Sequence, residues 1–187
     1  MNKRIWIGIF WAVVVGLGIY IFSKGQNNPA SQTNTPVVFD PLNATYTIDE
    51  QPVKLTEGKS EVEAEPGSAI KIITAIFGEP VIGDLNGDGK DDAAMFIVEN
   101  PGGTGTFYYA AAALNTPAGA QGTNAIFLGD RIAPQNIEIK DGQIIANYAD
   151  RKQDEPMAES PSVGVSKYMI VDKTILKTST GPREITK

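Results

Sequence analysis

One acidic stretch carries most of the chemistry that the sequence offers. Residues 83 to 92, GDLNGDGKDD, hold four aspartates, one asparagine and three glycines. Asp84, Asn86 and Asp88 occupy positions 1, 3 and 5 of a D-x-N-x-D-G-x-x-D pattern, with Lys90 at position 7 and Asp92 at position 9. Alternate side chains of such a loop converge on one point, and residue 7 offers its carbonyl oxygen. This oxygen-only set suits Ca²⁺, so the pattern predicts a structural calcium loop.

The predicted loop departs from a complete EF-hand, because position 12 is Met95 where an EF-hand has a bidentate glutamate. Its affinity should therefore be modest, with a Kd of about 10⁻⁴ to 10⁻³ M. The alternative is a turn that binds no ion, since Asn-Gly and Asp-Gly form turns by themselves. That alternative leaves the acidic groups at positions 1, 5 and 9 without an explanation.

The rest of the composition removes whole classes of function. The 187 residues include no histidine and no cysteine, which excludes a Ser-His-Asp triad, histidine-ligated zinc and thiolate chemistry. Sixteen Lys and Arg stand against 22 Asp and Glu, and such an acidic chain repels nucleic acid. We therefore expect no catalytic or cofactor-binding residue and no nucleic-acid partner.

The elements around the acidic stretch predict an α+β domain with a mainly antiparallel sheet and one packed helix. Residues 66 to 80, PGSAIKIITAIFGEP, predict the helix, with Ser68 as N-cap and Gly78 closing it, although its isoleucines also favour a strand. Asp141-Gly142 predicts a type I′ hairpin in which Ile139 faces Ile144 and Ile137 faces Ala146. The other expected strands are two short ones within residues 45 to 55, on either side of a turn at Asp49 to Pro52, then residues 93 to 99, 106 to 115, 123 to 130 and a final pair about Asp172-Lys173.

The N-terminus predicts attachment to a membrane. Residues 5 to 22 contain no charge and are long enough, as a helix, to approach the hydrocarbon thickness of a bilayer. A cleaved signal peptide is the alternative, but the run is long and no small-x-small cleavage site follows it. Lys3 and Arg4 should stay in the cytoplasm, which places the C-terminal domain outside.

The expected organisation has four parts: residues 1–22 form a transmembrane signal anchor, 23–43 a flexible linker, 44–178 the extracytoplasmic domain and 179–187 a polar tail. The oligomeric state is not predicted.

The order of the segments carries a family resemblance. GDLNGDGKDDAAMF, GTFYYAAAALN, NAIFLGDRIAPQNIEIKDGQIIANY and PSVGVSKYMI together resemble a family of uncharacterised extracytoplasmic bacterial proteins over residues 45 to 175. The acidic loop is similar to the short calcium loops of FG-GAP and dockerin-like proteins. Many members of the family carry a cysteine pair and a lipid anchor, both of which this chain lacks. The resemblance implies export, one compact domain and a setting in the bacterial cell envelope. It does not imply a particular activity, because the family has none established.

Three functions compete on these observations. The first is a non-enzymatic, membrane-tethered module that binds an envelope protein or polymer and carries a structural Ca²⁺. The second is a carboxylate-based, glycan-directed hydrolase of the envelope, for which the candidates lie near expected strand ends: Glu99, Asp130, Asp150 and Glu155. The third is a pilin-like subunit, which the absence of a cleavage glycine and of a glutamate at the fifth helical position disfavours.

Overall fold

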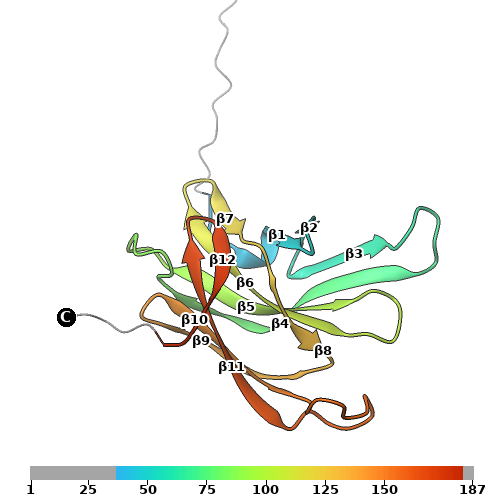
Figure 1. Cartoon of the computed structure of the whole chain (residues 1–187). Coiled ribbons are helices and arrows are strands. Elements are labelled where there is room, and N and C mark those ends of the chain that lie inside the picture. The colour runs from blue at the N-terminus through green and yellow to red at the C-terminus, as the bar shows by residue number, and fades with distance from the viewer. Residues whose placement is uncertain (1–36, 183–187) are drawn as a thin grey trace, which may run out of the picture. The chain divides into compact units, whose positions relative to one another are not determined.

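The computed structural model describes residues 37–182, and this part of the chain is built from antiparallel strands (Figure 1). In chain order the elements are η1 (Pro41–Asn43), a 3₁₀ helix, and the strands β1 (Thr45–Ile48), β2 (Gln51–Lys54), β3 (Lys59–Glu63), β4 (Lys71–Gly83), β5 (Asp92–Asn100), β6 (Phe107–Thr116), β7 (Gly119–Gly122), β8 (Ile126–Asp130), β9 (Ala133–Lys140), β10 (Gln143–Asp150), β11 (Val163–Asp172) and β12 (Ile175–Ser179). Contacts place residues 37–182 within one compact unit.

The strands form three layers. A six-stranded sheet in the order β3-β4-β5-β6-β7, with β8 also paired to β6, lies in the middle. A four-stranded sheet in the order β12-β11-β10-β9 packs on one of its faces, and the β1–β2 hairpin packs on the other. Figure 1 shows β5 and β6 in the interior, between the hairpin and the four-stranded sheet. Strands β5 and β6 are therefore buried on both faces, which explains why their sequences are continuous apolar runs.

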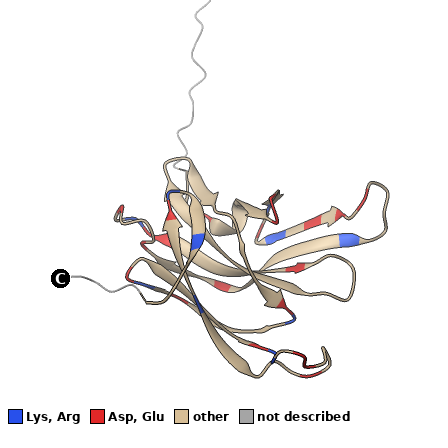
Figure 2. Cartoon of the chain, viewed as in Figure 1, with Lys and Arg blue, Asp and Glu red and all other residues tan. Residues whose placement is uncertain are grey.

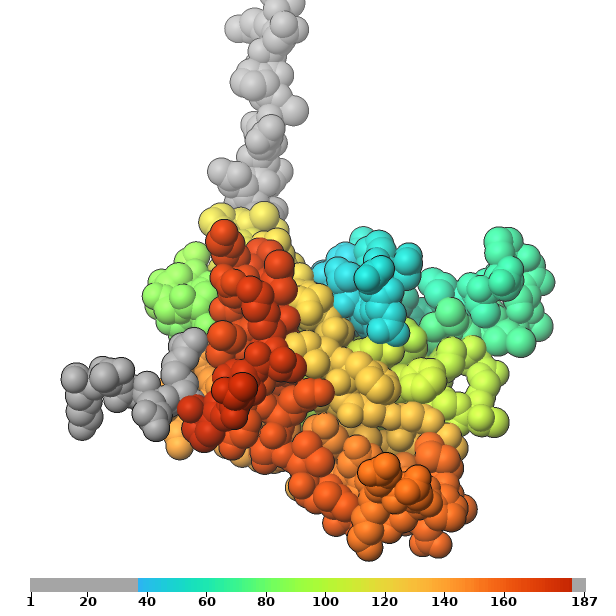
Figure 3. Space-filling model, in the orientation of Figure 1, coloured from blue at the N-terminus to red at the C-terminus, as the bar shows by residue number. Residues whose placement is uncertain are grey.

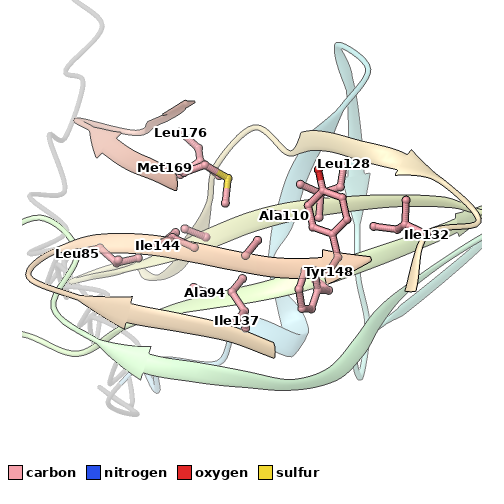
Figure 4. Packing of buried hydrophobic residues seen from close by; sticks show 13 residues of the cluster. Leu85, Ala94, Ala110, Leu128, Ile132, Ile137, Ile144, Tyr148, Met169 and Leu176 are labelled. Atoms are coloured by element: carbon pink, nitrogen blue, oxygen red, sulfur yellow. The ribbon is translucent and has the colours of Figure 1, made fainter. Parts of the chain in front are cut away.

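The first hydrophobic core lies between the two larger sheets (Figure 4). The six-stranded sheet contributes several small side chains there, such as Ala94 and Ala110, along with larger ones, and most of those from the four-stranded sheet are large, such as Ile144 and Met169. Large residues that face small ones allow two sheets to interdigitate at native density. Leu85 of the acidic loop lies at one end of this cluster and is 4% exposed.

The second core lies beneath the β1–β2 hairpin. Tyr46 and Leu55, both 0% exposed, pack on Met95 and Ile97 of β5 and on Tyr109 of β6. The Tyr46 hydroxyl donates a hydrogen bond to the Pro41 carbonyl oxygen at 2.7 Å, so the buried phenol is satisfied. The hairpin is thus fixed to the central sheet by a core of its own.

The predicted α+β class is wrong, because the expected helix at residues 66 to 80 is the long strand β4. Ser68 does not cap a helix; its Oγ accepts from the Ile70 amide in a local turn. Gly78, at φ +76°, lies where the β4–β5 register shifts between Phe77 and Val81, which marks a β-bulge. Pairing with β3 and β5 offers the β-branched isoleucines a packed sheet surface, and that outweighs the local helix signals.

Other expectations are confirmed by the strand pairing. Asp141 and Gly142 have φ values of 53° and 69°, as a type I′ turn requires, and Ile144 pairs with Ile139 and Ala146 with Ile137 as expected. The hairpin around Asp49 and the closing pair after Asp172 are also present. Strands β3 and β7 were not expected from the sequence.

The predicted membrane anchor at residues 5 to 22 lies outside the described residues, as does most of the predicted linker. Within residues 37–182, no helix has the length and apolar character needed to span a bilayer.

Candidate functional site

The acidic loop connects the end of β4 to the start of β5, so both of its ends are fixed in the central sheet. Gly83 pairs with Asp92 across its base, and the buried Leu85 side chain holds its first turn in the core. Gly87 and Gly89 adopt φ values of 80° and 79°, a conformation that glycine adopts without steric cost. The loop therefore curls back over a short distance, as its glycine spacing predicts.

The Asp84 carboxylate accepts hydrogen bonds from three backbone amides of its own loop. Its Oδ1 accepts hydrogen bonds from the amides of Asn86 at 3.2 Å and Gly87 at 2.7 Å, and its Oδ2 accepts from Gly89 at 3.0 Å. The Gly87 amide, followed by that of Gly89, holds the pKa of the Asp84 carboxyl below its ordinary value. A carboxylate that is hydrogen-bonded in this way stays ionised, which is the form that a cation requires.

The next two predicted ligands continue the same pattern. Asn86 Oδ1 accepts from the Asp88 amide at 2.9 Å, and Asp88 Oδ1 accepts from the Lys90 amide at 2.9 Å. Each of these side chains bonds the amide two residues further on, so all three polar groups turn toward the loop's own backbone. The Lys90 ammonium group lies 3.8 Å from Asp88 Oδ2, and both side chains are largely exposed.

Asp92 has a different environment from the other predicted ligands. The residue is 0% exposed, and its Oδ2 accepts from the Leu85 amide at 3.1 Å while Oδ1 accepts from the Asn115 amide at 2.8 Å. It therefore ties the loop to the far end of β6. Burial raises the pKa of the Asp92 carboxyl, and the charges of Asp88 and Asp84 raise it further.

The structure thus brings the predicted metal residues into one loop, with Asp84, Asn86, Asp88 and Lys90 on its outer part and Asp92 at its base. Within residues 37–182, no three side chains of the His, Cys, Asp or Glu type gather as a ready metal-holding group. The charges of Asp88 and Asp84 nevertheless act on Asp92, since both raise the pKa of its carboxyl.

A groove lies beside the β1–β2 hairpin, at the end of β5 opposite to the acidic loop. The groove, about 480 Å³ in volume, runs between the hairpin and the β3–β4 part of the central sheet. Figure 3 shows the hairpin and the β3–β4 segment as separate raised regions. Most of the lining is apolar, and the groove is bounded by Ile48, Asp49, Gln51, Pro52, Val53, Lys54, Ser60, Val62, Ile72, Thr74 and Glu99.

Two carboxylates line this groove, and each is held by a hydroxyl group. Thr74 Oγ1 donates to Glu99 Oε2 at 3.1 Å, and the Tyr109 hydroxyl donates to Asp49 Oδ2 at 2.9 Å. Burial raises the pKa of the half-buried Glu99 carboxyl, and the charge of Asp49 adds to the increase. A carboxyl with a raised pKa in an apolar recess is a recognised sign of a functional site.

The other three carboxylates considered for hydrolysis have different surroundings. Asp130 forms an ion pair with Arg131 at 2.8 Å, and Glu155 forms one with Lys152 at 3.3 Å. These contacts lower the pKa of both carboxyls, with the Arg131 hydrogen bond as the largest cause for Asp130 and the Lys152 amide for Glu155. Asp150 Oδ1 accepts from the Arg151 amide at 2.7 Å. None of these three lines the groove; of the four candidates, only Glu99 does.

Sequence reasoning singled out Glu99 but missed its partners in the groove. Asp49 lies 50 residues earlier in a predicted turn, and Thr74 lies in the segment expected to be a helix. No spacing in the sequence relates these residues, because β-pairing between distant segments brings them together. Figure 2 shows the remaining acidic residues spread over loops and strand ends rather than gathered on one surface.

The fold and its two sites define an all-β domain of packed sheets with an acidic interstrand loop and a lateral groove. The chain matches no protein-family model, and no significant match was found among curated proteins or solved structures.

Proposed function

We propose that the protein is a non-enzymatic binding or structural module of the cell envelope, attached to a membrane through its N-terminal apolar segment and stabilised by Ca²⁺ in the loop of residues 84–92. The observation that carries the calcium assignment is the position of Asp84, which accepts from the Gly87 and Gly89 amides and so curls the loop around its own carboxylate. Asn86 and Asp88 present further oxygens in the same loop, as an oxygen-preferring cation requires.

Calcium would be held by the side chains of Asp84, Asn86 and Asp88 and by the Lys90 carbonyl oxygen. Asp92 would complete the set from the base, since each carboxylate oxygen has a second lone pair besides the one that accepts from Leu85 or Asn115. A divalent cation at this place would offset the repulsion that the charges of Asp84 and Asp88 exert on the Asp92 carboxylate. Its role would be to stabilise the loop between β4 and β5.

Thermal unfolding of the full chain, in mild detergent with EDTA or with millimolar Ca²⁺, tests this assignment. At ten times Kd, bound calcium contributes about 1.4 kcal/mol, which corresponds to a rise in Tm of about 4 °C. The Asp88→Ala variant should lose the rise. Asp91→Ala should keep it, because Asp91 is exposed and falls outside the ligand positions. An equal Tm with and without Ca²⁺ in the unmodified protein would refute the calcium assignment.

A glycan-directed hydrolase is the second candidate, and one specific observation favours it. Glu99 has a raised pKa and shares its groove with Asp49, as a general acid and its carboxylate partner do in glycoside hydrolases. The groove, however, has a mostly apolar lining, whereas a sugar needs many hydrogen-bonding partners. Turnover of chromogenic glycosides or of cell-wall polymer that is lost in Glu99→Gln would establish this candidate in place of the binding role.

A further inference from the structure

The floor of the groove is a row of side chains that the β-register places on one face of the central sheet. Ser60 of β3 pairs with Thr74 of β4, Thr74 pairs with Glu99 of β5, and Glu99 pairs with Phe107 of β6. Directly paired residues of antiparallel strands point to the same face, with their Cβ atoms about 5 Å apart. Glu99 therefore stands between a hydroxyl-bearing neighbour and an aromatic ring.

The walls of the groove are apolar. Ile48 and Val53 of the hairpin form one side, and Val62 of β3 and Ile72 of β4 form the other. Val62 is 52% exposed although it lies in the sheet, so a large apolar side chain faces the open groove. A volume of about 480 Å³ falls within the range of small-molecule sites, about 300 to 1,000 Å³.

The acidic residues of the groove are near the hairpin turn. Asp49 lies in this turn and is close enough to Glu99 for its charge to act on that carboxyl, and the exposed Glu50 follows Asp49. The single basic residue of the lining, Lys54, is exposed and lies at the other end of β2, about 10 Å along the strand from Gln51. Asp49 and Glu99 thus favour a positively charged group near the hairpin turn.

A separate depression, which shares Asp49 with the groove, is lined by aromatic rings. Phe107, Tyr109 and Phe127 line, with Asp49, a shallow depression of about 320 Å³. Phe127 is 48% exposed, and its ring meets those of Tyr109 and Phe107 at centroid distances of 5.5 and 6.2 Å. Exposed aromatic rings beside a carboxylate form a favourable environment for an organic ammonium group.

We propose that this groove binds a small organic cation with an apolar chain, such as an alkylammonium compound. The ammonium group lies between Glu99 and Asp49, beside the Phe107 ring, and the chain extends along Ile48 and Ile72. This inference rests on the non-catalytic binding role proposed above, and it does not depend on calcium in the loop.

Three probes that share one apolar chain test the proposal: hexyltrimethylammonium, hexanol and hexanoate. Each is titrated into the full chain in mild detergent, and binding is followed by calorimetry and by the NMR shifts of groove residues. We expect saturable binding of the cation, weaker binding of hexanol and none of hexanoate. Equal binding of hexanol and the cation, or no binding of the cation at millimolar concentration, would overturn the proposal.

Matched variants locate the site. Glu99→Gln keeps the shape of the side chain and an oxygen that accepts from Thr74, and it should weaken cation binding about tenfold while leaving hexanol unchanged. Phe127→Ala should weaken cation binding by less than Glu99→Gln does. Glu79→Gln, an exposed position in the β4 bulge outside the groove, is the control and should have no effect. Equal losses in Glu79→Gln and Glu99→Gln would overturn the proposal, because they would show a general effect of net charge.

The two proposals fail in distinguishable ways. Asp88→Ala removes the predicted calcium response but should leave the affinity for hexyltrimethylammonium unchanged, and thermal unfolding of each variant confirms that it is folded. Turnover of a glycoside that requires Glu99 would replace the non-catalytic role, and hexyltrimethylammonium would then be expected to act as a competitive inhibitor only if it occupies the groove. Turnover that the cation does not inhibit would overturn its placement beside Glu99.

Discussion

The surroundings of two carboxylates near strand β5, Asp84 and Glu99, shift their pKa values in opposite directions. In the loop that precedes β5, backbone amides of the loop lower the pKa of the Asp84 carboxyl. In the groove near the last residue of β5, burial raises the pKa of the Glu99 carboxyl. The charged form of the carboxyl group is thus stabilised in Asp84 and destabilised in Glu99.

The difference comes from the origin of the surrounding groups. The partners of Asp84 are residues two to five positions further along the chain, so the loop carries its own hydrogen-bond donors. The surroundings of Glu99 come from β4, β6 and the β1–β2 hairpin, which are distant in sequence. A local loop is robust to changes elsewhere, whereas the groove depends on the docking of the hairpin.

The largest loss of stability is expected from a substitution at the base of the acidic loop. Asp92→Ala leaves the Leu85 and Asn115 amides without their carboxylate partner, and we expect it to lower the free energy of unfolding by about 2 to 4 kcal/mol. Urea unfolding in EDTA measures this without any contribution from calcium. The exposed Asp91→Ala should change it by no more than about 0.5 kcal/mol. Similar losses in both variants would contradict the bridging role of Asp92.

A smaller effect is expected where the hairpin meets the central sheet. A Cβ at Gly122 would overlap the Thr45 carbonyl oxygen and lie 2.8 Å from Tyr46 Cδ1, so Gly122→Ala must displace the hairpin, at a cost of about 1 to 3 kcal/mol. Urea unfolding measures the cost, and amide exchange in β1 and β2 should speed up.

The control for this change is Gly103→Ala, which meets nothing within 4 Å. If the loop is self-contained, Gly122→Ala should keep the full calcium response of Tm while it weakens cation binding in the groove. A lost calcium response would show that the two ends of β5 are coupled.

The smallest effect on stability is expected from Glu99→Gln, which should raise the stability of the protein where the two substitutions above lower it. Because the pKa of Glu99 is raised in the folded state, its own contribution to stability should fall as the pH rises from the ordinary carboxyl pKa through the raised value, and stay constant above it. Glu99→Gln should lack this loss and be more stable near pH 7, by no more than about 3 °C in Tm. Thermal unfolding between pH 4 and 8 measures it, with Glu79→Gln as control. A variant less stable than the wild type at pH 7 would contradict the burial argument.

Such a gain would also sharpen the contrast between the two regions. Asp92 would then be a carboxylate that the fold requires, and Glu99 one that the fold tolerates at a cost in stability. Residues that lower stability while they line a recess are characteristic of binding sites.

The sequence predicts the fold best where interactions are local. Asp141-Gly142 specifies its type I′ turn, and the alternation on either side then specifies the register that pairs Ile144 with Ile139. The apolar runs of β5 and β6 also predict buried strands, because a continuous apolar run is typical of a strand that is covered on both faces. The short strands β3 and β7 carry no such pattern, because one is largely exposed and the other is a four-residue segment with a glycine at each end.

The segment from Lys71 to Gly83 shows the limit of local reasoning. Ser68 and Gly78 resemble helix caps, but Ser68 forms a turn and Gly78 a bulge once β3 and β5 pair on either side. A single sequence contains the turn residues and the β-branched side chains, but not the partner strands that decide between them.

By itself, the sequence determined the composition of the acidic loop, the tight hairpin turns, the buried strands and the absence of histidine and cysteine chemistry. The turns follow from backbone conformation and from hydrogen bonds between residues close together in the chain, and the strands from their continuous apolar runs. Only the tertiary structure decided that β4 is a strand, that Asp92 is buried and that Glu99 shares an apolar groove with Asp49. These depend on burial and on pairing between distant segments, whose free energies exist only once the sheets have packed.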